Sequence, residues 1–316
     1  GTTVSDGILR LGAGVSRLAT GALTMAGGTF DLNGQYQIIG PLSGTGGRVL
    51  VNGQFLQVDQ STNTTFGGTI EGSGRLVKAG NGTLTLSGSN THTGGTAIGS
   101  GTLAVASDAA LGAAGGALAI EGGFLQTTAS FSTARTTSLL NGGGFDVDYG
   151  TTLTHGGTIS GSGYLVKQGA GTLVLEGTNT YTAETVLGQG TLKVTSDAAL
   201  GAASANLRMQ GGTLWTVGDI VLARSVQSLG NYGMFLVESG TTTLQGPLSG
   251  DGILTKDGAG TLTLAGTSTY SGRMDVLAGT LQGTTSTLRG TIYNYGRVVF
   301  DQDTDGSYQG FMQNSG

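Results

Sequence analysis

The sequence contains no cysteine, so both a disulfide framework and a thiolate metal site are excluded. Charged residues make up only 10% of the 316 residues and the net charge is −5 without any basic run, which argues against binding to nucleic acid. No stretch approaches ~18 uninterrupted apolar residues, so the sequence predicts no transmembrane helix. The N-terminus, Gly1 followed by "TTVSDGILRL", has no basic segment leading into an apolar one. We therefore expect no signal peptide here and interpret Gly1 as a position inside a longer protein.

Proline occurs only twice, whereas glycine accounts for 63 residues. The scarcity of proline excludes a collagen-like chain or a proline-rich linker. Leucine, valine and isoleucine recur steadily and the net charge is small, so the composition also argues against intrinsic disorder. Abundant glycine and threonine with regularly placed apolar residues predict many short strands joined by tight turns.

A repeat of 89 residues organises most of the chain. The segment "GTIEGSGRLVKAGNGTLTL" begins at Gly68, and "GTISGSGYLVKQGAGTLVL" begins at Gly157, which is 157 − 68 = 89 residues later. A third copy, "GPLSGDGILTKDGAGTLTL", begins at Gly246 and keeps the same spacing. Shorter remnants of the opening motif begin at Gly40 and Gly310. We predict a single domain over residues 1–316, with internal repeats at 68–156, 157–245 and 246–316, the last one shortened.

Within one repeat, pairs of apolar residues two positions apart predict short strands that return about every 22 residues. These pairs are Leu84/Leu86, Leu103/Val105, Phe145/Val147 and Leu173/Leu175, with a weaker strand marked by Phe124. Such spacing predicts an all-β fold, a right-handed parallel β-helix of about 14 coils of about 22 residues. The alternative is a β-propeller, whose blades need about 40 to 50 residues each. The segment "SDAALGAA" predicts one isolated helical turn, capped by Ser or Asp and stopped by Gly.

The repeated motif carries a family resemblance. The segment "GSGYLVKQGAGTLVLEGTNTYTAETVLGQGTLKV" resembles the passenger-associated transport repeat of bacterial autotransporters, and "YNYGRVVFDQDTDGSYQGFMQNSG" is similar to the stretch that commonly precedes another such repeat. The resemblance implies a Gram-negative type V secretion passenger, secreted to the cell surface. Its partner would be the C-terminal outer-membrane β-barrel of the same polypeptide, which this chain does not contain. It also implies that the repeats assist export and folding.

Candidate catalytic and metal-binding residues are few, and we predict no catalytic residue and no cofactor. The two histidines are His92, in a slot that Tyr181 and Tyr270 fill in the next copies, and His155; we interpret both as structural, His92 as a turn residue. No serine lies in a Gly-x-Ser-x-Gly elbow.

Acidic residues near the C-terminus suggest one weak metal site. Asp301, Asp303 and Asp305, with a glycine at the sixth position, reproduce the first half of a calcium loop, but Met312 stands where a bidentate glutamate belongs. We interpret this segment as a solvated turn, with a weak calcium site as the alternative.

Charged side chains elsewhere are interpreted as surface groups. Arg273 and Asp275 precede Arg297 and Asp301 by about one coil, so these two pairs are predicted to be neighbours in a surface ion-pair patch. Asp146 and Asp148 alternate with apolar residues and are expected to point outward. The recurring Lys78, Lys167 and Lys256 are expected to cover the coil edge while their amines stay in water.

Two classes of function remain open from the sequence. In the first, the chain is a non-catalytic β-helical rod at the cell surface that acts as an adhesin, in self-association or attachment to host or other surfaces, or as a display stalk. Contacts would be spread over outward Thr, Asn and Ser and over aromatic residues such as Tyr149, Trp215 and Tyr232. In the second, it is the stalk of an autotransporter enzyme with an upstream protease or esterase domain, or a polysaccharide-active β-helix.

Overall fold

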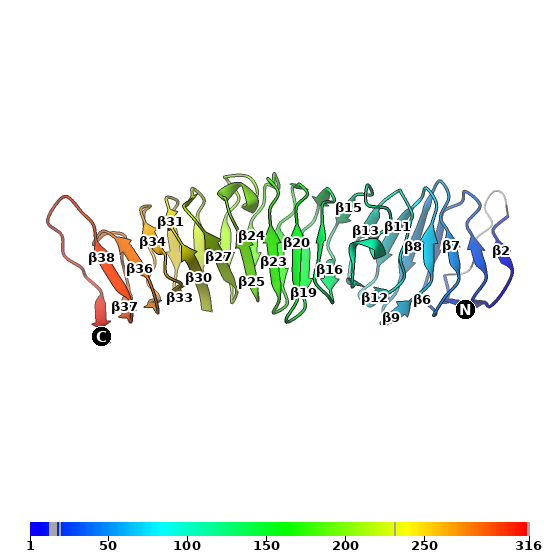
Figure 1. Ribbon diagram of the computed structural model, residues 1–316, viewed down its shortest axis with the longest axis horizontal. Helices are drawn as coiled ribbons and strands as arrows, with labels where there is room; N and C mark the ends of the chain where they lie inside the picture. The colour runs from blue at the N-terminus through cyan, green and yellow to red at the C-terminus, as the bar shows by residue number, and fades with distance from the viewer. Residues whose placement is uncertain (13–17, 19, 231, 315–316) are drawn as a thin grey trace. The chain divides into compact units, whose positions relative to one another are not determined.

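The computed structural model describes residues 1–12, 18, 20–230 and 232–314, and these form short strands with two single helical turns (Figure 1). All strand pairings within this part are parallel, and each strand pairs with one that lies about 20 residues away in the sequence. This is the arrangement of a β-solenoid, with about 15 turns in total. The predicted parallel β-helix is therefore confirmed, and the β-propeller alternative, which needs antiparallel blades, is wrong. No helix among the described residues has the length and apolar character needed to cross a bilayer.

The chain divides into two compact units, unit 1 over Gly1–Gly163 and unit 2 over Tyr164–Gly316. Unit 1 holds five runs of neighbouring strands. They are β1 (Thr2–Val4), β3 (Leu23–Met25) and β6 (Leu42–Ser43); β2 (Ile8–Arg10), β4 (Thr29–Asp31), β7 (Arg48–Leu50) and β10 (Thr69–Glu71); β5 (Gln37–Ile39), β8 (Phe55–Asp59), β11 (Arg75–Ala79), β13 (Thr96–Ile98), β15 (Leu118–Ile120), β18 (Thr137–Leu139) and β21 (Ile159–Gly161); β9 (Thr64–Phe66), β12 (Thr83–Leu86), β14 (Thr102–Val105), β16 (Phe124–Thr127) and β19 (Gly143–Val147); and β17 (Phe131–Thr133) with β20 (Thr152–His155).

Unit 2 holds three such runs. They are β22 (Leu165–Gln168), β24 (Thr185–Leu187), β26 (Leu207–Met209), β29 (Val226–Ser228) and β32 (Leu248–Gly250); β23 (Thr172–Leu175), β25 (Thr191–Val194), β27 (Thr213–Val217), β30 (Tyr232–Ser239), β33 (Ile253–Asp257), β35 (Arg273–Val276), β37 (Thr291–Asn294) and β39 (Phe311–Asn314); and β28 (Ile220–Leu222), β31 (Thr241–Leu244), β34 (Thr261–Leu264), β36 (Thr280–Gly283) and β38 (Arg297–Phe300).

Apolar side chains of matching positions stack inside each unit. In unit 1, Leu84 pairs with Leu103, Leu103 with Leu125, and Leu125 with Phe145, and all four are fully buried. The steps are 103 − 84 = 19, 125 − 103 = 22 and 145 − 125 = 20 residues, close to the predicted coil length. The weaker strand marked by Phe124 is confirmed as β16, in which Leu125 is the buried residue and Phe124 lies half-buried on the outer side. Stacked leucines thus form the core, and the alternation leaves every second side chain outside.

The two helical turns are 3-10 helices, η1 (Asp108–Leu111) in unit 1 and η2 (Asp197–Leu200) in unit 2. Each is a single turn, as predicted, and each ends at a glycine with positive φ, 93° at Gly112 and 85° at Gly201. The predicted cap is wrong in one respect, because the serine before each turn makes no side-chain capping hydrogen bond. The aspartates that begin the turns instead bind arginines from the following coils, described below.

Candidate functional site

The three repeated lysines lie inside the solenoid, which corrects the prediction that their amines stay in water. The side chains of Lys78 and Lys167 are fully buried and Lys256 is 2% exposed. Each Nζ donates hydrogen bonds to three backbone carbonyl oxygens, two in the turn that follows and one in the next coil. The acceptors are Ala79, Gly80 and Ser100 for the first lysine, Gln168, Gly169 and Gln189 for the second, and Asp257, Gly258 and Ala278 for the third. The repeated lysine is therefore an internal tie between two coils.

The carbonyl cage explains why this position is lysine in all three copies. An ammonium group has three donors and no acceptor, which matches three inward carbonyls. Burial lowers the pKa of Lys78 and of Lys256 to about 8, because leaving water disfavours the charged form. The turn is also closed to other residues: at Gly190, with φ of 63°, an added Cβ would lie 2.9 Å from the Nζ of Lys167. We conclude that these amines are occupied by structural bonds.

His92 lies in the connection between β12 and β13, where a turn residue was predicted, and its side chain occupies an interior slot of the repeat. Its side chain is fully buried, and its Nε2 lies 3.0 Å from the Oγ1 of Thr96. Because that hydroxyl donates its own hydrogen to the carbonyl of Leu111, Nε2 must be the donor to it. In the next copy, Tyr181 lies with its hydroxyl 2.6 Å from the Oγ1 of Thr185 and fills the same role. The imidazole thus replaces a phenol as an internal donor.

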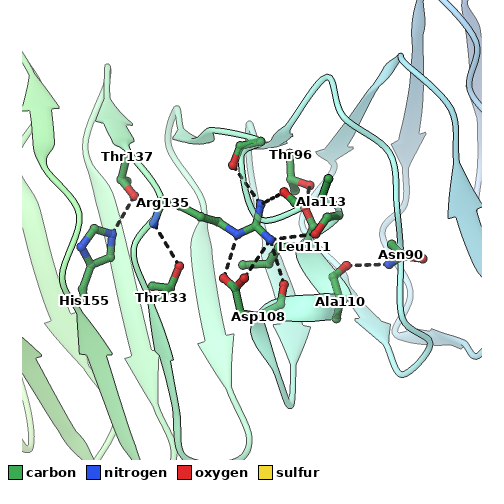
Figure 2. A network of polar contacts seen from close by, with 12 residues as sticks. Asn90, Thr96, Asp108, Ala110, Leu111, Ala113, Thr133, Arg135, Thr137 and His155 are labelled. Atoms are coloured by element: carbon green, nitrogen blue, oxygen red, sulfur yellow. Dashed lines mark hydrogen bonds and ion pairs between the residues drawn. The ribbon is translucent and has the colours of Figure 1, made fainter.

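His155 is the second buried imidazole. It is fully buried, its Nε2 lies 2.8 Å from the Oγ1 of Thr137, and its ring packs against Phe145 with centroids 5.6 Å apart (Figure 2). Burial lowers the pKa of both His92 and His155 to about 4, so both rings are neutral at pH 7. The structural interpretation of His155 agrees with this position.

An arginine-centred network ties η1 to the coil after it. Figure 2 shows Arg135 reaching from the end of β17 to η1, where its Nε and one terminal nitrogen bind the carboxylate of Asp108 at 2.7 and 2.9 Å. The remaining donors reach the carbonyls of Asp108, Gly112, Ala113 and Gly116 at 2.7 to 3.1 Å. The guanidinium is 2% exposed and the carboxylate 26%. All polar hydrogens of a buried cation are thereby paired.

Unit 2 repeats this network 89 residues later. Arg224, fully buried, binds the carboxylate of Asp197 at 2.7 Å and the carbonyls around η2. Neither arginine was predicted as a functional or structural residue from the sequence. Their spacing, 224 − 135 = 89 residues, together with that of the aspartates, 197 − 108 = 89, was the signal that could have found them.

The acidic residues near the C-terminus do not gather into a metal-binding group. Asp301, Asp303 and Asp305 lie in the exposed connection from β38 to β39, drawn red in Figure 1. The carboxylate of Asp301 accepts a hydrogen bond from Gln282 at 2.7 Å. Throughout residues 1–12, 18, 20–230 and 232–314, no three histidine or acidic side chains are placed to share a metal ion.

The predicted neighbourhood of Arg273 and Asp275 with Arg297 and Asp301 is wrong. Arg273 lies on β35, which pairs with β33 and β37, whereas Arg297 lies on β38 and pairs with β36. Arg273 instead binds Asp275 on its own strand, with Nε 2.8 Å from the carboxylate, and lies over the ring of Tyr293. A separation of about one coil in the sequence therefore did not make these residues neighbours, because they lie on different runs of strands.

Outward positions on several strands carry threonine. Thr241 pairs with Thr261 and Thr261 with Thr280 along β31, β34 and β36, and Thr83 pairs with Thr102 in unit 1. The predicted outward aromatic residues are confirmed in part: Tyr149 is 87% exposed and Tyr232 41%. Trp215 is half-buried, because Lys193 lies 3.8 Å above its ring. Asp146 and Asp148 are outward and half-buried, as predicted.

Comparison with known proteins gives three findings. A family model described as the passenger-associated transport repeat matches residues 76–105, 165–194 and 254–282, with starts 89 residues apart. The adhesin BmaC autotransporter of Brucella suis biovar 1 (strain 1330) is 35% identical over 203 residues, which cover 63% of this chain and 6% of that relative. The chain therefore spans only a small part of the length of the relative. No solved structure matches.

Proposed function

This chain belongs to the passengers of autotransporters built on passenger-associated transport repeats, and from that premise we propose that it is a non-catalytic adhesive segment displayed on the bacterial surface. In the whole protein, a C-terminal outer-membrane β-barrel of the same polypeptide would deliver it there. Its ligands would be other copies of the passenger or surfaces of a host or substratum. The 35% identity to a protein named as an adhesin supports this direction.

The observation that carries the proposal is the position of the chain's reactive side chains. Both histidines and the three repeated lysines point into the solenoid, where His92 bonds to Thr96 close by in the chain, His155 bonds to Thr137 of the preceding coil, and each lysine bonds to carbonyls of its own turn and of the next coil. Buried and hydrogen-bonded in this way, these groups hold coils together and do not face a substrate. What the outside offers is repeated threonine and aromatic side chains, which suit many weak contacts made in parallel.

A settling assay tests the proposal. The parent passenger would be displayed on bacteria that do not aggregate, beside a version lacking residues 68–245, which removes 2 × 89 = 178 residues and keeps the period. We expect the full passenger to clump the cells or attach them to a surface, and the deletion to remove this while surface display persists. Dispersed, unattached cells with normal display would contradict an adhesive role and would favour a display stalk.

The enzyme alternative has its own readout. Turnover of a polysaccharide panel by the purified chain, abolished by Asp275→Asn or Asp301→Asn, would contradict the non-catalytic proposal. We expect no turnover, because Asp275 is held by Arg273 and Asp301 by Gln282, on different strand runs.

A further inference from the structure

One outer face of unit 2 departs from the threonine-rich pattern. On β27, β30 and β33 the outward side chains include Trp215, Tyr232, Met234, Leu236 and Ile253, which together we call the β30 patch. All five are half-buried or exposed, and β30, with 8 residues, is the longest strand described. The residues that alternate with them along the strands, such as Phe235, are buried in the core. The patch therefore consists of outward side chains and is not an exposed part of the core.

The strand register makes these side chains contiguous. Trp215 pairs with Leu236, Tyr232 pairs with Ile253, and Met234 lies between Tyr232 and Leu236 on the same side of β30. Trp215 is also the only tryptophan of the chain. Tryptophan, tyrosine and methionine are enriched at the centres of protein interfaces, whereas outward positions of a solvated strand are usually polar. The composition therefore indicates a protein-binding face.

Lys193 and Asp257, at opposite edges of the patch, complete a row that is complementary to itself, while Glu238 on β30 accepts a hydrogen bond from the indole of Trp215 at 2.8 Å. Across four neighbouring strands the pairing runs from Lys193 to Trp215, from Trp215 to Leu236, and from Leu236 to Asp257. The row thus reads cation, aromatic, aliphatic, anion. A two-fold axis parallel to the strands and midway between β27 and β30 would place Lys193 of one copy over Asp257 of another, and Trp215 over Leu236.

We propose that the β30 patch binds the same patch of a second copy of this chain, face to face about that two-fold axis. The inference rests on the proposed adhesive function and names the partner for this face. Apolar contact in the centre and two symmetry-related Lys193–Asp257 pairs at the rim would fix the register.

The size of the patch sets the strength of the contact. Four strands at ~4.8 Å spacing and ~5 residues at ~3.3 Å give about 300 Å². Standard stable interfaces bury about 800 Å² on each partner, so an isolated pair is weak. On a cell that displays many copies, the weak contacts act together and hold cells by avidity.

The first test uses the purified 316-residue chain, with sedimentation velocity and the emission of Trp215 followed over a concentration series. We expect reversible association, with a blue shift of emission as Trp215 leaves water. Leu236→Thr should raise the dissociation constant by about tenfold or more. The matched control is Val221→Thr on β28, an outward residue that is 48% exposed and outside the patch, and it should leave association unchanged. A chain that stays monomeric throughout, or equal effects of both variants, would overturn the proposal.

A charge-exchange experiment tests the two-fold geometry. Lys193→Glu gives like charges at each rim contact in a pair of identical copies, and so does Asp257→Lys, so each variant alone should associate less than the unmodified chain. An equal mixture restores opposite charges at both contacts and should associate more strongly than either variant alone. A mixture no better than its components would contradict the face-to-face arrangement.

The settling assay separates this inference from the proposed function. If cells displaying the Leu236→Thr passenger clump as fully as the unmodified passenger, the patch is not the contact and the adhesive proposal stands. If the chain is monomeric in solution and Leu236→Thr abolishes only attachment to a foreign surface, the patch serves another partner and the second copy is wrong. If the unmodified passenger neither clumps nor attaches cells, the proposed function itself fails.

Discussion

At the scale of single residues, buried polar side chains decide which coils can stack. Lys256 closes one turn by bonding three carbonyls, and those carbonyls lose their partners when the amine is removed. A buried acceptor left without a donor costs about 1–3 kcal/mol. A few lysine, histidine and arginine side chains inside the solenoid therefore determine which coils can stack on each other.

The lysine tie is tested by Lys256→Met, which keeps the length of the stem and removes the ammonium. We expect the free energy of unfolding of unit 2 to fall by about 1–3 kcal/mol in urea titrations followed by circular dichroism. Lys193→Met is the matched control, since Lys193 lies on the outer face over Trp215, and it should change stability far less. Equal losses for both variants would contradict an internal tie.

The buried histidines predict that unit 1 loses stability in acid. With an ordinary pKa of 6.5 and a folded pKa of about 4, each ring stays neutral when folded but takes up a proton when unfolded between these values. Stability is unaffected above pH 6.5 and falls below it, by about 1.4 kcal/mol per pH unit for each histidine until about pH 4.

His92→Tyr tests this, because the same slot already accepts Tyr181 in the next copy. We expect the drop in urea midpoint between pH 7 and pH 4.5 to become smaller in this variant. Thr85→Ser, on the outer side of β12, serves as the non-titrating control and should keep the full drop. An unchanged acid response in His92→Tyr would show that this imidazole is not the sensor.

At the scale of elements, the arginine networks explain how a single 3-10 turn stays ordered without a side-chain cap. Arg135 and Arg224 each reach back from the following coil to hold the aspartate and the last carbonyls of a turn. A turn of four residues has too few internal hydrogen bonds to be stable alone. The order of η1 and η2 is therefore supplied by tertiary contact.

Arg135→Met should destabilise η1 by leaving Asp108 and several carbonyls unpaired. We expect a loss of about 3–5 kcal/mol, the range for breaking a buried pair from one side, with faster amide hydrogen exchange over η1 than elsewhere in unit 1. Arg10→Met is the control, because Arg10 is 60% exposed in its pair with Asp31 and contributes little. Uniform exchange across unit 1 in Arg135→Met would contradict a local role.

At the scale of the whole molecule, the 89-residue period decides which deletions leave coils that can still pair with each other. Coil length, strand phase and the internal lysine slot all repeat at 89 residues, so removing one full period should leave every coil with a matching neighbour. The chain without residues 157–245 should keep its β-sheet spectrum and a cooperative melt. Removing 157–234, which breaks the period, should abolish the cooperative melt. Equal melts for the two deletions would contradict the periodic account.

The 89-residue period and the strands could be predicted from the sequence, whereas the polar contacts inside the solenoid could not. The alternation of apolar residues around Leu84 and Leu103 predicted the strands and the length of a coil, because burial of every second residue is a local property of a strand. The lysines were placed wrongly and the arginines were missed, because a charged side chain is usually outside. The two histidines were interpreted as structural, but their partners Thr96 and Thr137 were not predicted. The neighbours of Arg273 were wrong for a related reason: coil lengths vary, so spacing alone does not tell which run of strands a residue joins.

The most direct test of the central claim is made with beads coated with the purified 316-residue chain, because nothing else of the parent protein is then present. Bead clustering and attachment to surfaces would be counted beside beads that carry the same density of an unrelated β-solenoid. The account predicts clustering or attachment that rises with coating density, as expected for many weak contacts. Beads that stay as dispersed and unattached as the control at every density would contradict an adhesive role for this chain.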